Sequence, residues 1–162
     1  MPPRTLNDEL DSSERKVLTD IREHGWHVVK VFNDDDAERG FAFTIGLPTT
    51  FQHPEFIIIG LKLGLMHILL NNLGAELQGG RRFKAGETYD GLLEGYQCTF
   101  RKVSRHWYRE YLGYATWYHQ GMDYEVLQVV WPDQENRLPW HPSATAAFRE
   151  QQPVLEQPPP LA

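Results

Sequence analysis

A histidine and a carboxylate stand two residues apart at His53-Pro-Glu55, directly before the apolar run 56–59. An imidazole beside a carboxylate can act as a general base that the carboxylate supports, or the two groups together can be metal ligands. Zinc and iron centres need three or four ligands, and neither HExxH nor a second His/Asp pair at metal spacing is present. We therefore predict no metal site and keep a metal-dependent enzyme using His53 and Glu55 as an alternative. The structural interpretation is a proline turn in which the imidazole donates to a carbonyl.

Asp133 is a third candidate catalytic residue, because Trp131-Pro-Asp133 has the order of the mobile acid loop of tyrosine phosphatases. Those enzymes also need a cysteine in a phosphate loop with arginine five residues further on, and here Val103 is the fifth residue after Cys98. No GxSxG elbow is present either. Phosphatase and serine-hydrolase chemistry are therefore excluded. In the structural interpretation the proline ends a strand and Asp133 caps the following turn.

Aromatic and small polar residues are expected at strand ends, where they can line one pocket. Tryptophans provide flat walls for a planar ligand, and a loop with hydroxyls and a glycine leaves room for a phosphate. We therefore predict a planar or phosphorylated small molecule, flavin- or nucleotide-like, with flavin as the possible cofactor. Hydroxyls in a turn and tryptophans closing the core are the structural alternatives. The candidate ligand-binding residues are Thr44, Gly46, Thr49, Thr50, Gln128, Trp131 and Trp140.

Periodicity and turn residues predict the elements that position these side chains. Apolar residues at helical spacing predict helices over 9–24, 63–77 and 105–119. Residues rich in β-branched and aromatic types predict strands over 26–32, 41–45, 55–60, 96–103 and 124–131, with a short turn or edge strand near residue 87.

The order of these elements predicts an α+β fold. The first two strands are joined too tightly for a parallel βαβ unit, so we expect a mainly antiparallel five- to six-stranded sheet or small split barrel with about three flanking helices. A flexible N-terminus over 1–8, a single domain over 9–142 and a Pro-rich mobile tail over 143–162 complete the expected organisation.

Charge and composition restrict the possible partners. The chain has 162 residues, a net charge of −6 and a pI near 5.6, which disfavours nucleic acid as a partner. A local exception is a basic patch or a solvated rim formed by Arg81, Arg82, Lys84, Arg101, Lys102 and Arg105. The acidic balance and Pro-rich end also fit a protein-interaction module of the immunity or adaptor type.

A reducing compartment and the absence of a membrane anchor are also expected. Cys98 is the only cysteine and should be a buried, inert thiol. Residues 1–18 contain no apolar leader, and no apolar run is long enough to span a bilayer. We therefore expect a cytoplasmic protein. Of the scattered histidines, only His27 is kept as a candidate for function.

Four motifs occur in order along the chain: GWHVVKV (25–31), FAFTIGL (41–47), HPEFIIIGL (53–61), and LQVVWPD with RLPW (127–133 and 137–140). Together they resemble an uncharacterised bacterial family, the domain of unknown function numbered 4262, over residues 20–141. The resemblance brings no established activity with it.

Overall fold

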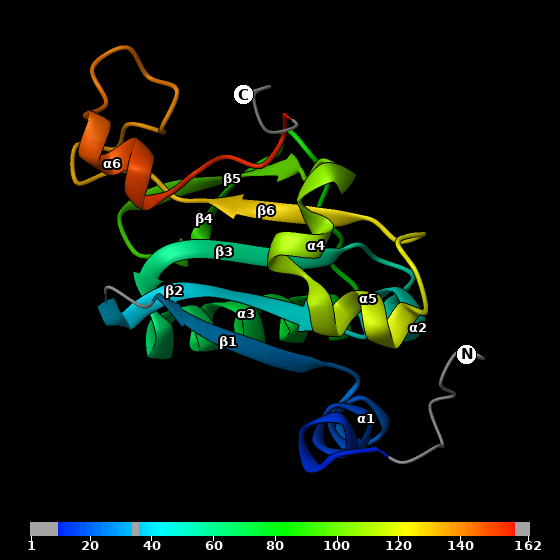
Figure 1. Cartoon of the computed structure of the whole chain (residues 1–162). Coiled ribbons are helices and arrows are strands. Elements are labelled where there is room, and N and C mark those ends of the chain that lie inside the picture. Colours follow the sequence, from blue (N-terminus) through cyan, green and yellow to red (C-terminus); the bar gives the residue numbers. More distant parts are fainter. Residues whose placement is uncertain (1–9, 34–35, 158–162) are drawn as a thin grey trace.

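The computed structural model describes residues 10–33 and 36–157 (Figure 1). The strands in this part are β1 (His27–Asn33), β2 (Asp36–Ile45), β3 (Glu55–Lys62), β4 (Thr88–Leu93), β5 (Tyr96–Lys102) and β6 (Val126–Val130). The helices are α1 (Ser12–His24), α2 (Leu47–Phe51), α3 (Leu63–Gln78), the 3₁₀ turn η1 (Arg105–Trp107), α4 (Tyr108–Tyr111), α5 (Gly113–His119) and α6 (Ala146–Gln151).

The strands form one open, mixed sheet in the order β1-β2-β3-β6-β5-β4. All neighbouring strands are antiparallel except β3 and β6, which run parallel with Glu55 opposite Val126. The α+β class and the mostly antiparallel sheet are confirmed, whereas the split barrel is wrong. The parallel pair arises because α3, the β4–β5 hairpin and α4–α5 all intervene before the chain returns beside β3.

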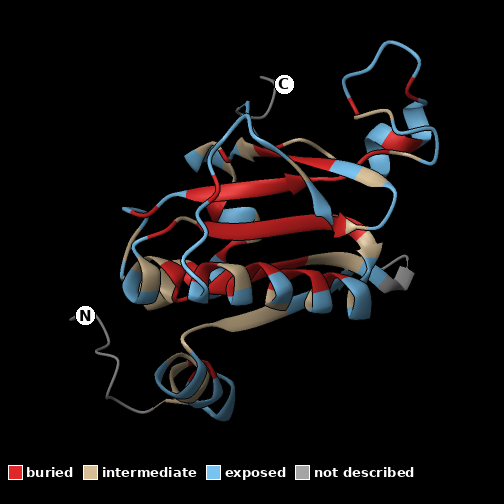
Figure 2. Cartoon of the chain, turned by 180° about the vertical axis from the view of Figure 1, so that it is seen from behind, coloured by how far each residue is buried: buried red, intermediate tan, exposed pale blue. Residues whose placement is uncertain are grey.

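Helices cover both faces of the sheet, with α3 behind it and α4 and α5 in front (Figure 1). Alternate residues of β3 therefore enter different apolar clusters: Phe56 and Ile58 join the cluster under α3, and Ile57 and Ile59 join the cluster under α4 and α5. Figure 2 shows that the central strands are buried along most of their length. This burial on both faces explains why the sequence of β3 is apolar without alternation.

The expected helix over 105–119 is broken into η1, α4 and α5. The break falls at Leu112, whose φ of −123° and ψ of 38° lie outside the helical region. Leu112 is fully buried, and the next residue is Gly113, which weakens a helix by its backbone freedom. The aromatic spacing correctly indicated the buried side but could not show this turn.

Residues 143–157, expected as part of a mobile tail, are docked on the domain. The Gln128 amide donates to Pro153 O (2.8 Å) and accepts from the Leu155 amide (2.8 Å), and Leu155 is fully buried. Gln152 bonds both the N–H and the C=O of Trp131. The attachment depends on scattered glutamine amides, those of Gln128, Gln151 and Gln152, and on single apolar anchors, so it has no periodicity that the sequence could reveal. Residues 1–8 and 158–162, the other expected mobile parts, lie outside the described residues.

Candidate functional site

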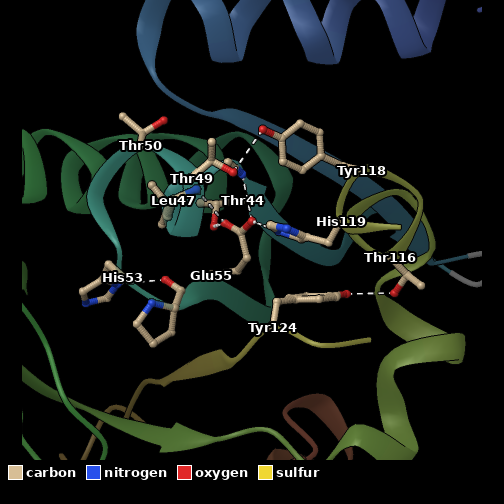
Figure 3. Close-up of polar contacts among 12 residues, drawn as sticks. Thr44, Leu47, Thr49, Thr50, His53, Glu55, Thr116, Tyr118, His119 and Tyr124 are labelled. Atoms are coloured by element: carbon tan, nitrogen blue, oxygen red, sulfur yellow. Dashed lines mark hydrogen bonds and ion pairs between the residues drawn. The ribbon is translucent and has the colours of Figure 1, made fainter. Parts of the chain in front are cut away.

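Glu55 is the first residue of β3 and its side chain is fully buried. Its carboxylate accepts hydrogen bonds from the Thr44 hydroxyl (2.9 Å) and from the backbone N–H groups of Gly46 (2.8 Å) and Leu47 (3.2 Å) (Figure 3). Gly46 allows this approach because its φ of 113° strongly favours glycine. The strand end and the β2–α2 turn thus form a closed cage around one carboxylate.

The fourth partner of Glu55 comes from α5. His119 Nε2 lies 2.8 Å from Glu55 Oε2, and its ring stacks on Tyr124 with centroids 4.4 Å apart (Figure 3). A carboxylate only accepts, so His119 Nε2 carries the proton of this hydrogen bond. A carboxylate that orients an imidazole is an arrangement typical of general bases. The His119 side chain is only 11% exposed, which leaves little room for a substrate.

Thr44, Gly46, Thr49 and Thr50 do not form an open phosphate cradle. The Thr44 hydroxyl donates to Glu55 and accepts from the Phe56 amide (2.9 Å). Thr49 accepts from the Tyr118 hydroxyl, and Thr50 donates to the Gly25 carbonyl. The polar groups expected for a phosphate are therefore used to attach the loop to β3, α5 and the end of α1.

His53 is buried but belongs to a different environment from Glu55. Its Nδ1 lies 2.8 Å from Pro54 O, and the Phe83 amide donates to Nε2 at 3.1 Å. Nε2 also lies 3.1 Å from Phe83 O, and a neutral ring with its proton on Nδ1 donates to Pro54 O and accepts from the Phe83 amide. Burial lowers the pKa of His53, and the nearby Arg82 contributes in the same direction. This geometry supports the turn interpretation, in which the imidazole donates to a carbonyl.

The lowered pKa of His53 predicts a pH-dependent stability. Above its ordinary value of 6.5 the ring is neutral in both the folded and unfolded states. As the pH falls from there through the lowered folded-state pKa, the unfolded chain binds the proton first, so the free energy of unfolding decreases. We expect this decrease to be smaller in His53→Gln, measured by urea unfolding between pH 8 and pH 5. An equally steep decrease in the variant would assign it to other groups.

His53 and Glu55 do not support a metal centre. Their polar atoms are engaged with separate partners, the backbone at residues 54 and 83 for one and the 44–47 turn with His119 for the other. Across the described ranges, no group of three or more His, Cys, Asp or Glu side chains could hold a metal ion.

The expected pocket between the Thr44–Thr50 loop and the Trp131–Trp140 segment is not formed. Glu55 begins β3, whereas Trp131 donates from Nε1 to Ile59 O (2.7 Å), four residues further along the same strand. Four residues of β-strand span about 13 Å. The two halves of the expected pocket therefore lie at opposite ends of the parallel β3–β6 pair.

The tryptophans and Asp133 also separate from one another. Trp131 and Asp133 share a hollow of about 570 Å³, but Asp133 accepts from Arg137 Nε (3.0 Å) and from two backbone amides, as a turn cap does. Trp140 is 44% exposed and lies under the Arg101 guanidinium in a different hollow. Gln128 holds the C-terminal segment, as described above.

A larger polar hollow lies elsewhere, at the β1 edge of the sheet. It has a volume of about 640 Å³ and lies between α1, β1 and α3. We call it the α1–α3 groove. Its lining residues are Lys16, Asp20, Glu23, His24, Trp26, His27, Val28, Lys30, His67, Asn71 and Gln78.

Trp26 is held in this groove by α3. A Cβ at position 74 would overlap with the Trp26 indole, so Gly74 allows the ring to lie directly against the helix. The indole N–H donates to Asn71 Oδ1 (2.9 Å), and Phe51 contacts the ring at a centroid distance of 6.1 Å. A glycine in the middle of α3 is unfavourable for the helix alone, and this close approach explains it.

Two histidines present ring nitrogens to the groove. His27 Nδ1 lies 2.6 Å from Asp20 Oδ2, and Lys16 bonds the other Asp20 oxygen at 2.8 Å. Burial, Lys30 and His27 all lower the pKa of His67. Within the described ranges, no protein group hydrogen-bonds His27 Nε2 or either nitrogen of His67. His27 was a candidate from the sequence, but the other groove residues could not be grouped with it, because the lining residues lie on three separate elements.

The fold and these sites define an α+β domain with one open mixed sheet and a polar groove at its first edge. Residues 20–145 match the family model of a domain of unknown function, DUF4262, and the chain belongs to this family. The resemblance seen in the four motifs is thereby confirmed. No curated protein and no solved structure matches the chain. None of the helices in the described ranges is long and apolar enough to span a membrane.

Proposed function

We propose that this domain binds a small organic ligand with a planar ring in the α1–α3 groove. The observation that carries the proposal is that one hollow of about 640 Å³ combines a fixed indole, Trp26, with His27 Nε2 and the His67 ring nitrogens, which have no hydrogen-bond partner within the described ranges. Ligand pockets combine flat apolar surface with a few polar groups that set orientation. The volume lies within the usual range for such pockets, about 300–1,000 Å³.

The polar residues favour a ligand that both donates and accepts hydrogen bonds. The lowered pKa of His67 keeps its imidazole neutral near pH 7, so one nitrogen donates and the other accepts. The Asp20 carboxylate engages Nδ1 of His27, which leaves Nε2 as the ring nitrogen available to a ligand. The planar, flavin- or nucleotide-like ligand inferred from the sequence is compatible with these groups, but at this groove and not at the 44–50 loop.

A thermal-shift screen of flavins and purine and pyrimidine nucleotides tests the proposal. A ligand present at 100 times its Kd stabilises the fold by about 2.7 kcal/mol, which raises Tm by about 5–10 °C for a domain of this size. We expect His67→Phe to abolish the shift, because the new ring enters the groove and forms no hydrogen bonds. Lys62→Met is the control: Lys62 is exposed, precedes the same helix without a side-chain capping hydrogen bond and does not line the groove.

A protein-interaction role is the second candidate, and the exposed edge strand favours it. β1 is the first strand of the sheet order, and Phe32 and Val31 at its end are 60% and 36% exposed. Edge strands with apolar side chains are templates for pairing with another chain. The thermal-shift screen separates the two roles. If none of the compounds raises the Tm of the wild type, ligand binding in the groove is not supported, and protein interaction through the β1 edge becomes the favoured function.

A further inference from the structure

A second hollow with a different character lies beside His53, between the segment after α3 and the strands β5 and β6. Its volume is about 300 Å³. Phe83, Val126 and Leu127 are apolar lining residues with little exposed surface. The cationic residues of its lining are Arg82, Lys84 and Lys102. We call this site the basic hollow.

The charge of the basic hollow is opposite to that of the whole chain, which carries −6. Glu125 is the one acidic residue among the lining residues that the structure describes, and it pairs with Lys102 at 3.1 Å. Arg82 donates to the carbonyls of Phe51 and Gln52, which are neutral, and it forms no ion pair with a residue that the structure describes. Lys84 is exposed and forms no ion pair within the described ranges. The lining therefore carries three positive charges and one negative charge.

The effect of this charge is visible on a neighbouring group. Arg82 helps to lower the pKa of His53, after the larger effect of burial. Both His53 nitrogens face the backbone at residues 54 and 83, so the histidine forms part of the wall and is not a free ligand. The groups able to contact a bound molecule are thus the three cations and the apolar surface between them.

We propose that the basic hollow binds a small anion that carries an apolar body, a carboxylate or phosphate monoester on a short hydrocarbon chain or ring. The cations select the anionic group by charge. Pro54 and Ala85, the apolar lining residues that are half-buried and exposed, contribute by removing apolar area of the ligand from water. The site is separate from the α1–α3 groove, so the proposal does not depend on the function proposed above.

Hexanoate, hexanol and hexylamine are suitable probes because they share one apolar body and differ in the charged group. We expect amide signals of residues 83–85 and 126–127 to shift on titration with hexanoate in an NMR experiment at low salt, with much weaker responses to hexanol and hexylamine. Lys84→Met should weaken hexanoate binding about fivefold, the scale of one solvent-exposed charge pair. The fold should be unaffected, since the Lys84 side chain has no hydrogen bond or ion pair within the described ranges, and Tm checks this.

Lys62→Met is the matched control, with the same change of charge at an exposed residue outside the hollow. The proposal is overturned if this variant loses as much affinity as Lys84→Met, or if hexylamine binds as tightly as hexanoate. A comparison of inorganic phosphate with hexyl phosphate tests whether the apolar body of the ligand contributes to binding. Binding of phosphate as tight as that of hexyl phosphate would overturn that part of the proposal, whereas tighter binding of hexyl phosphate supports it.

Discussion

Replacing Glu55 with glutamine is expected to lower the free energy of unfolding by about 3–5 kcal/mol, the usual loss when one partner of a buried charged network is removed. The variant keeps the size of the side chain and one acceptor oxygen. Its amide nitrogen, however, must replace one of two oxygens that each receive only donors. Oε1 accepts from the Thr44 hydroxyl and the Leu47 N–H, and Oε2 accepts from the Gly46 N–H and His119. At least one buried donor then loses its acceptor. Urea unfolding at pH 7 measures the difference.

Glu125→Gln is the control for this prediction. Glu125 is 55% exposed and pairs with Lys102, so its replacement should change the unfolding free energy by about 0.5 kcal/mol or less. A double-mutant cycle with His119→Ala then isolates the contribution of the Glu55–His119 contact. Additive effects of the two substitutions would show that the carboxylate stabilises the 44–47 turn alone and does not hold α5.

The arrangement of Glu55 illustrates what the sequence could and could not predict. The β3 strand was predicted by its apolar run, and Glu55 was singled out by its neighbour His53. Its actual partner, His119, is 64 residues away and reaches it only because α5 crosses the sheet face above the start of β3. Short motifs indicate which residues are unusual, whereas partners across the fold depend on tertiary packing. For that reason the local pair His53–Glu55 was a misleading pattern.

The position of Trp131 shows the same limit at the level of topology. Aromatic residues at strand ends were correctly recognised, but which end each occupies depends on strand direction. The sequence favoured antiparallel neighbours, and the one parallel pair, β3 with β6, places the 44–50 loop and Trp131 at opposite ends. By contrast, the sequence contains an indication of the contact between Trp26 and α3, because Gly74 lies inside a helical pattern where no turn is expected.

Ending the chain at Pro142 is expected to prevent folding, although the sequence suggested that the domain closes there. The truncation removes Phe148 and Leu155 from the two apolar clusters and leaves Gln128 and the Trp131 backbone without partners. Losing large core side chains costs about 2–5 kcal/mol each, and each unsatisfied buried polar group costs about 1–3 kcal/mol. Together these losses approach the total stability of a small domain, about 5–15 kcal/mol. Circular dichroism and size-exclusion chromatography detect the loss.

If the truncated chain aggregates, its free energy of unfolding cannot be measured, and a single substitution in the same segment tests the prediction. Leu155→Ala leaves both glutamine contacts in place and should lower the unfolding free energy by about 2–5 kcal/mol, because Leu155 is fully buried between β6 and the segment after β5. Glu156→Gln, next to it in sequence and 38% exposed, should change the value by less than about 0.5 kcal/mol. Equal stability of Leu155→Ala and Glu156→Gln would mean that the segment contributes little, as expected of a tail. A large difference between them makes residues 143–157 an integral part of the domain, held to β6 by Gln128 and Gln152.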